Sequence, residues 1–261
     1  MVEGSRNGAP NNDRERKVAA WIAGIAGFYV VSLFLVPMLM PANSVPELSG
    51  RANTIDYWSE GSWGNHEHEE GGAMGHNQSA HGGAFVVSEL NPYFLFVYAF
   101  GDLNCHQKHE RSWEINGNQM AVCARDVGIF FGITIGALWF AYRGRNRWTV
   151  RDTFLTLLPD EWLEVAYVKD QRLLWMWGLL FIIGAPMVLD GGIQAVTAYE
   201  STNPMRLATG APFGFAIAWL FASSLSARPQ VFDHDASKVI LPGGARLVST
   251  ETEVAPPTSD A

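Results

Sequence analysis

The sequence predicts an all-α polytopic transmembrane helix bundle, with four spans plus one interfacial or re-entrant helix. Two observations predict this class. The 261-residue chain is 48% hydrophobic and 17% charged, whereas about a quarter of the residues in soluble domains are charged. Its apolar residues are also gathered in runs, and four runs approach the roughly 20 residues that the hydrocarbon core of a bilayer requires.

The four expected spans follow from the lengths of these runs. The first, 19–40, comes after a basic segment at residues 14–17. It is longer than the apolar core of a cleaved signal peptide, so we expect it to be retained. The other three cover residues 122–142, 173–196 and 207–226.

Residues 85–103 form an element whose depth the sequence leaves open. Glu89, Asn91 and Pro92 interrupt an apolar run that continues from residue 93 to residue 100. Proline is accepted in the first turn of a helix, so Asn91-Pro92 predicts a helix start. The resulting helix lies at the membrane interface, re-enters the bilayer or crosses it as a fifth span.

Basic residues orient the bundle. Arg143, Arg145, Arg147 and Arg151 form the densest positive cluster, which marks the cytoplasmic side. We therefore expect a multi-pass protein of the cell membrane with both the N-terminus and the C-terminus cytoplasmic. The expected divisions are a cytoplasmic tail at 1–18, the first transmembrane helix at 19–40, a His-rich acidic extracytoplasmic loop at 41–84, a membrane domain carrying the cysteine motifs at 85–226, and a disordered cytoplasmic tail at 227–261.

Charge excludes one class of partner. The formal net charge is −8, and the basic cluster is explained by topology, so we expect no nucleic acid partner. The expected partners are the lipid bilayer and a lipid-like or small anionic substrate. The sequence does not indicate an oligomeric state.

Both cysteines open short motifs, Cys-His-Gln at 105–107 and Cys-Ala-Arg-Asp at 123–126. Cysteine and histidine bind zinc and other thiophilic divalent metals, so Cys105, His106, His109 and Cys123 are candidate metal ligands. Three states of the thiols are compatible with the sequence: a metal site, a disulfide between Cys105 and Cys123, and reduced structural thiols.

Asp126 and Arg125 open the second expected span. On a helix, Cys123 and Asp126 share a face, while Arg125 points elsewhere. Asp126 is either a catalytic or ligand residue or a carboxylate that complements the positive end of the helix dipole.

Asp190 ends an apolar stretch, and Gln194 follows one turn later. An acidic group at membrane depth needs a partner, for which Asn203 and Arg206, together with Arg125 or Arg111, are the candidates. The alternative is an interfacial aspartate near the end of its helix.

The loop before residue 84 holds His66, His68, His76 and His81 among acidic residues. Such a tract can hold metal loosely. It lacks an apolar framework to fix a geometry, so a disordered loop is the preferred interpretation.

The motifs resemble a prokaryotic family of predicted membrane proteins, domain of unknown function 2085, over residues 93–226. The resemblance rests on Cys105-His106-Gln107, Glu110-Arg111-Ser112, Gly117, Cys123-Ala124-Arg125, Gly128, Gly132, Asp190-Gly191, Gln194, Asn203, Arg206 and Thr209-Gly210. It implies a polytopic membrane protein and gives no reaction. Many members have a second cysteine where this chain has Asp126, and a carboxylate can still bind zinc there.

Three functions are compatible with these residues. The first is a metal- or thiol-dependent membrane enzyme, with Asp190 as base or ligand and Arg125 or Arg206 holding an anionic head group. The second is a small transporter that uses Asp190 as its binding group. The third is a structural membrane protein in which the cysteines form a disulfide staple.

Overall fold

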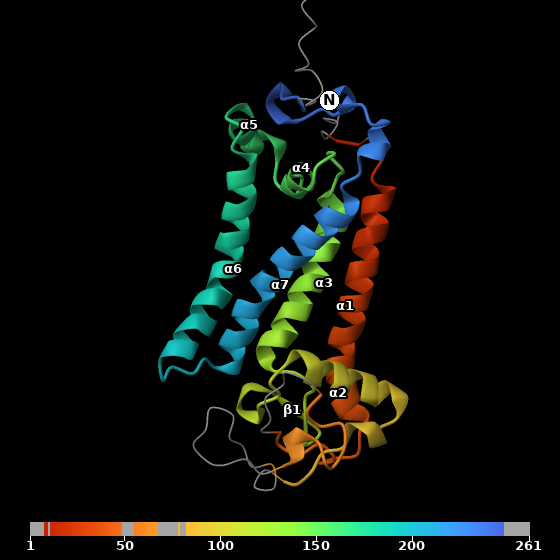
Figure 1. Ribbon diagram of the computed structural model, residues 1–261, viewed down its shortest axis with the longest axis vertical. Coiled ribbons are helices and arrows are strands. Elements are labelled where there is room, and N and C mark those ends of the chain that lie inside the picture. The colour runs from red at the N-terminus through yellow and green to blue at the C-terminus, as the bar shows by residue number, and fades with distance from the viewer. Residues whose placement is uncertain (1–7, 10, 49–54, 67–77, 79–81, 248–261) are drawn as a thin grey trace, which may run out of the picture. The chain divides into compact units, whose positions relative to one another are not determined.

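The computed structural model describes residues 8–9, 11–48, 55–66, 78 and 82–247. Its regular secondary structure is helical apart from two short strands, and four of its helices are long and apolar enough to cross a membrane (Figure 1). These are α1 (Asp13–Leu39), α3 (Ala124–Arg143), α6 (Arg172–Val196) and α7 (Asn203–Ser226). The expected helix bundle with four spans is confirmed, and α1 begins six residues before the expected start at residue 19.

The remaining elements are short. They are α2 (Pro92–Asn104), α4 (Val150–Leu155), α5 (Asp160–Val168), the strands β1 (Glu114–Ile115) and β2 (Asn118–Gln119), and 3-10 turns at Trp63–Asn65, Val87–Glu89, His109–Arg111, Pro229–Phe232, Ala236–Lys238 and Pro242–Gly244. The two strands pair antiparallel, with Glu114 opposite Gln119. Asn116 and Gly117 connect them with positive φ angles of 57° and 71°, as a two-residue hairpin requires.

The helix α2 starts where the Asn91-Pro92 pair predicts. Asn91 caps it, because its side-chain oxygen accepts hydrogen bonds from the backbone N–H groups of Tyr93 and Phe94 at 3.0 Å. Its 13 residues extend about 20 Å, less than the roughly 30 Å of a hydrocarbon core. Figure 1 draws α2 transverse to α1, and an interfacial or re-entrant helix fits this length.

The chain folds as two compact units, one from residues 1–21, 137–181 and 219–261 and the other from residues 22–136 and 182–218. We call them the first and second unit. In the second unit an apolar core joins α1, α2, α3 and the loops between them. Tyr29 on α1 donates a hydrogen bond to the carbonyl oxygen of Val97 on α2 at 3.3 Å.

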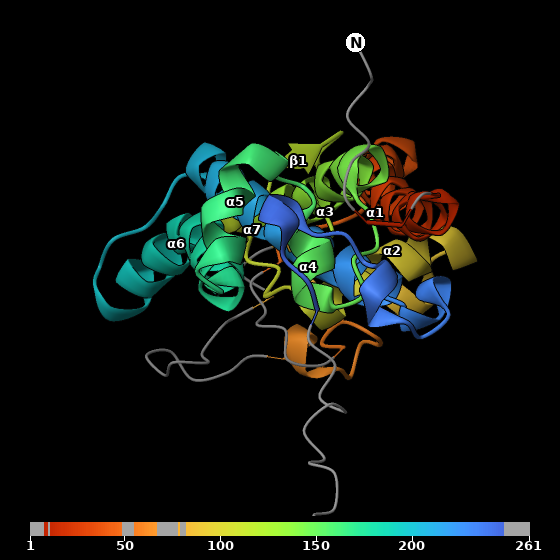
Figure 2. The same ribbon diagram turned by 90° about the horizontal axis from the view of Figure 1, so that it is seen from above.

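Close packing of α3 on α7 depends on glycines. In the second unit the helices follow in the order α6, α7, α3 and α1 in both views (Figure 2). Small residues recur every four positions on the facing surfaces: Gly128, Gly132 and Gly136 on α3, Gly210 and Gly214 on α7. A Cβ atom on Gly136 would lie 2.8 Å from the carbonyl oxygen of Phe215. Such spacing allows two membrane helices to bring their backbones together.

In the first unit, buried polar side chains hold the short helices. Asp152 is fully buried, caps α4 together with Thr149, and lies 3.5 Å from Arg172. Part of the segment expected to be a tail is folded here, because three 3-10 turns between residues 229 and 244 bury Phe232 and Leu241. Of the histidines in the His-rich loop, His68, His76 and His81 lie outside the described residues, whereas His66 is exposed.

Candidate functional site

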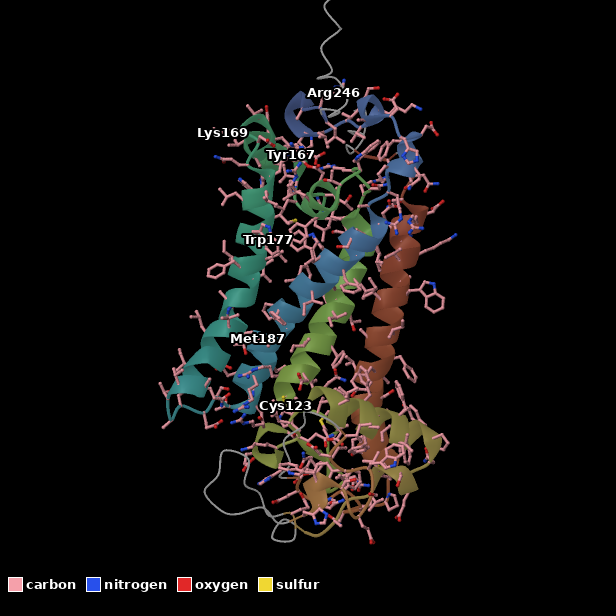
Figure 3. The ribbon with its side chains drawn as sticks, viewed as in Figure 1. Cys123, Tyr167, Lys169, Trp177, Met187 and Arg246 are labelled. Carbon is pink, nitrogen blue, oxygen red and sulfur yellow. The ribbon has the colours of Figure 1, made fainter. Side chains whose placement is uncertain are left out.

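Three metal-ligand side chains converge where α2 ends and α3 begins. Cys105 is the C-cap residue of α2, Cys123 stands directly before α3, and Asp126 lies in the first turn of α3. One ligand atom from each of the three lies within 4.8 Å of the others. Both cysteines are free thiols, and Figure 3 labels Cys123 at this end of α3. We call these three residues the Cys/Asp group.

Hydrogen bonds connect the members of the Cys/Asp group. The Cys123 thiol donates to the Asp126 carboxylate at 3.1 Å, and the backbone N–H of Cys123 donates to the Cys105 sulfur at 3.1 Å. Cys105 is 3% exposed. The hydrogen bond with Cys123, together with burial, raises the pKa of the Cys105 thiol. A free Cys105 is therefore protonated at neutral pH, and a metal ion would have to displace that proton.

Gln107 explains how Cys105 reaches Cys123. Its buried side chain donates to the carbonyl oxygen of Ala121 at 2.8 Å, and its own carbonyl oxygen accepts from the Gln119 side chain at 2.9 Å. These bonds tie residues 105–107 to the segment that leads into α3. They also hold Gln107 at a φ of 43°, a left-handed conformation that is uncommon for residues other than glycine. The glutamine of the Cys-His-Gln motif is thus a structural residue.

The two candidate histidines lie outside the Cys/Asp group. His106 is exposed. His109 belongs to the turn at His109–Arg111, and its Nε2 atom lies 3.5 Å from the Glu47 carboxylate. A role for either histidine in metal binding stays a prediction.

Arg125 joins α3 to α6 in the second unit. Its Nη2 atom donates to the Asp190 carboxylate, and the side-chain oxygens of Gln194 and Ser201 lie 3.5 and 3.4 Å from the same nitrogen. The hydroxyl of Tyr199 donates to the other oxygen of Asp190 at 3.3 Å. Asp190 is 8% exposed, so these donors supply the partner that a buried carboxylate requires.

Glu200, between α6 and α7, collects the other two arginines. Its carboxylate accepts from Arg111 at 2.8 Å, from Arg206 at 2.7 Å and from Gln194. Burial opposes ionisation of Glu200, but the guanidinium groups of Arg111 and Arg206 outweigh it, so the pKa of Glu200 is lowered. Glu200 was not among the residues predicted from sequence, because it stands in a polar loop outside the apolar runs.

We call Arg111, Arg125, Asp190, Gln194, Glu200 and Arg206 the arginine network. It and the Cys/Asp group meet at two adjacent residues of α3. Consecutive side chains on a helix point about 100° apart, so Asp126 faces Cys105 at the end of α2 while Arg125 faces α6. Of the residues predicted from sequence, eight fall into these two groups, and His106 and His109 do not.

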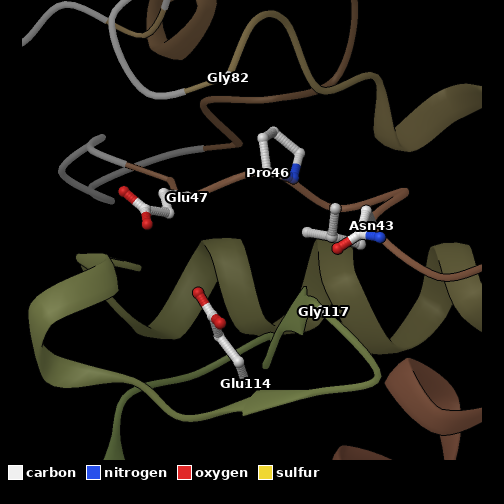
Figure 4. A pocket seen from close by; sticks show the side chains of 7 residues that line it. Asn43, Pro46, Glu47, Gly82, Glu114 and Gly117 are labelled. Atoms are coloured by element: carbon white, nitrogen blue, oxygen red, sulfur yellow. The ribbon is translucent and has the colours of Figure 1, made fainter.

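A separate hollow in the second unit lies beside the hairpin (Figure 4). It has a volume of about 490 Å³, and its described lining includes the carboxylates of Glu47 and Glu114 together with Asn43. None of the candidate residues is among the described residues that line it.

Comparison with known proteins places the candidate residues inside a shared region. The model of a family described as predicted membrane protein DUF2085 matches residues 105–220, which include every candidate site residue. The uncharacterized protein MJ1492 of Methanocaldococcus jannaschii is 32% identical over 137 residues, 51% of this chain and 73% of that protein. An uncharacterized protein of Methanothermobacter thermautotrophicus is 32% identical over 116 residues, 44% of this chain and 82% of that protein. No solved structure matches the chain.

Proposed function

The chain belongs to the DUF2085 family of predicted membrane proteins, and we propose that it is a metal-dependent membrane protein in which the Cys/Asp group binds zinc or another thiophilic divalent cation. The observation that carries this proposal is the convergence of three ligand atoms within 4.8 Å of one another. Cys105 comes from the end of α2, whereas Cys123 and Asp126 come from the start of α3. Two thiolates and one carboxylate form a ligand set that zinc accepts.

The number of ligands favours a reactive site over a purely structural one. Structural zinc sites are closed by four protein ligands, whereas catalytic sites have three and leave a position for water or substrate. A bound metal would supply Lewis acidity and lower the pKa of a bound water. The Cys/Asp group offers three ligands among the described residues, so it fits the open class.

The arginine network gives the site a preference for negative charge. Arg125 precedes Asp126 in the chain, and its guanidinium group donates a hydrogen bond to Asp190. We assign Asp190 the task of positioning Arg125, since its carboxylate is already occupied by that guanidinium. An anionic or lipid-like substrate bound at the metal would then lie close to Arg125.

The distribution of basic residues supports an outward position for the site. The basic cluster of Arg143, Arg145, Arg147 and Arg151, at and after the last residue of α3, supports a cytoplasmic position for that end of the helix by the positive-inside rule. The start of α3, with the Cys/Asp group, then faces outward. Cytoplasmic N- and C-termini complete the proposed topology.

A structural function is the second candidate, and one observation favours it. Each arginine of the network bonds with a carboxylate, Arg125 with Asp190 and Arg111 and Arg206 with Glu200. Pairing of this kind is sufficient to hold α3, α6 and α7 together without any ligand. In this case the two thiols would be structural, either reduced or joined in a disulfide.

Metal and thiol content decide between these functions. The full chain is purified in a mild detergent without chelators, and metal per chain is measured by mass spectrometry together with free thiols. We expect about one metal per chain in the wild type, its loss in Cys105→Ser and Cys123→Ser, and weaker binding in Asp126→Asn.

His109→Ala is the matched control, because His109 faces Glu47 and lies outside the Cys/Asp group. It should keep the metal if the Cys/Asp group supplies the ligands; loss of the metal would support the sequence-based prediction that His109 is a ligand. Wild-type protein without metal would refute the proposal. The absence of free thiols would then identify a disulfide, whereas two free thiols would identify reduced structural cysteines.

A further inference from the structure

An apolar groove opens along three candidate membrane spans in the second unit, between α3, α6 and α7. Its volume is about 430 Å³, within the range of about 300–1,000 Å³ typical of ligand pockets. Phe131 and Ile135 on α3, Ile183 on α6, and Pro212 and Phe215 on α7 are among its lining residues. No lining residue carries a charged or hydrogen-bonding side chain, so the groove suits a hydrocarbon chain.

The arginine network lies at one end of this groove on all three helices. Arg125 precedes Phe131 by six residues, and Arg206 precedes Pro212 by six, each about 9 Å along its helix. On α6 the network residue comes after the groove residue in sequence. Asp190 follows Ile183 by seven residues, about 10 Å along the helix. A chain in the groove therefore has the network within reach of a head group.

The arginine network itself carries one more positive group than negative groups. Three guanidinium groups face two carboxylates, Asp190 and Glu200. Among the described residues, the Nε atom of Arg125 is buried and has no hydrogen-bond partner. A guanidinium with an unused donor matches the geometry of a phosphate, which accepts two parallel hydrogen bonds from arginine.

We propose that the groove holds the hydrocarbon chain of one phosphate-headed lipid whose phosphate lies against Arg125. Charge complementarity selects this occupant over a neutral lipid. Size argues against a second copy of the chain, because eight described residues line the groove, whereas a stable protein interface uses about 20–30 residues on each side. Such a lipid would be the substrate class of the proposed function. The inference rests on that function only for the metal that would lie beside the phosphate.

Native mass spectrometry of the full chain in detergent tests the proposal. The probes are dioleoylphosphatidic acid, dioleoylglycerol with the same chains, and glycerol 3-phosphate as the head group alone. We expect phosphatidic acid to bind at least about tenfold more tightly than dioleoylglycerol, as charge-assisted hydrogen bonds predict. Glycerol 3-phosphate should not compete at equal concentration.

Two adjacent isoleucines give a matched pair of groove variants. Ile183→Trp fills the groove and should lower phosphatidic acid binding at least about tenfold. Ile182→Trp changes a neighbour that is 68% exposed and outside the groove lining, and should bind as the wild type does. If Ile183→Trp does not fold, Ala208→Leu at an exposed lining position repeats the test.

Binding of the phosphate head group is tested by the double variant Arg125→Gln/Asp190→Asn. This variant removes both charges, so that neither is left buried without its partner. This double variant should bind the two lipids equally. All lipid measurements are repeated in Cys105→Ser, where binding should persist, so that failure of the metal proposal is separable from failure of this one.

Three results would overturn the inference. Equal binding of both lipids by the wild type would mean ordinary bilayer lipid only. Full competition by glycerol 3-phosphate would mean an anion site that does not use the groove. A change from dimer to monomer in Ile183→Trp would mean that a second copy occupies the groove.

Discussion

Asp102 on α2 gives the sharpest stability prediction. Its side chain is fully buried in the second unit. One carboxyl oxygen accepts from the backbone N–H of Tyr57 at 3.0 Å, and the other has no hydrogen-bond partner among the described residues. Burial, reinforced by the nearby charge of Asp56, raises the pKa of Asp102 from 3.8 to about 7. The folded protein therefore prefers Asp102 in its neutral form.

The sign of the pH dependence follows from this raised pKa. Between pH 3.8 and pH 7 the folded state binds a proton at Asp102 that the unfolded state has released, so stability falls as pH rises. The loss is about 1.4 kcal/mol for each pH unit. The contribution is complete below pH 3.8 and absent above pH 7, and the span between those values corresponds to roughly 4 kcal/mol.

Asp102→Asn should remove this dependence. Asparagine keeps an acceptor for the Tyr57 N–H group and does not ionise. We expect the variant to match the wild type near pH 4 and to exceed it at pH 8, by up to roughly 4 kcal/mol in the free energy of unfolding. Denaturant unfolding in detergent, followed by tryptophan fluorescence from pH 4 to pH 8, measures the difference.

Glu89→Gln is the control for this experiment, since Glu89 is an exposed carboxylate in the turn before α2. It should leave the pH dependence of stability as in the wild type. If Asp102→Asn instead lowers stability at pH 8, Asp102 is ionised and stabilised in the folded state, and the argument from burial is wrong.

Two further predictions concern packing, one in each unit. Gly132→Leu should destabilise the second unit by about 1–3 kcal/mol, because a side chain there overlaps the backbone of Ala211. Gly24→Leu, with open space at its Cβ position, should leave the melting temperature in detergent unchanged, and equal effects of the two would contradict the proposed α3–α7 contact. Trp219→Phe should lower the melting temperature by removing the 2.7 Å hydrogen bond to the carbonyl oxygen of Phe154, a loss of about 1–3 kcal/mol. An unchanged melting temperature would show that water replaces that bond.

The long helices could be predicted because their signal is local. A run of about 20 apolar residues has few other uses, and the expected span at 122–142 differs from α3 at Ala124–Arg143 by two residues or fewer at either end. The start of α2 was predictable for the same reason, since a cap and a proline are adjacent in sequence. Its depth was not, because the interrupted run could belong to a buried or an interfacial helix.

The short helices of the first unit escaped prediction. The helices α4 and α5 have 6 and 9 residues, too few for a membrane run. Their stability comes from tertiary contacts such as the buried Asp152 with Arg172, and helices this short are marginal without such contacts. The same holds for the folded turns after residue 228, whose composition resembles a tail.

Within the candidate site, local spacing was informative and long-range pairing was not. Cys123 and Asp126 share a helix face by their spacing alone, and their side chains are hydrogen-bonded. The approach of Cys105 depends on the buried Gln107, which no spacing rule identifies. One sequence feature could have identified Glu200 as a site residue: it is an acidic residue in a short loop between Gln194 and Arg206.

The adjacency of Arg125 and Asp126 makes the two halves of the proposed site separable by mutation. Asp126 points to the cysteines and Arg125 to Asp190, so a change in one group leaves the contacts of the other in place. Cys105→Ser should then remove metal without altering lipid preference, and the Arg125→Gln/Asp190→Asn double variant should do the reverse. If either variant abolishes both properties, the first turn of α3 acts as one structural unit. The structural function of the arginine network would then be the better account.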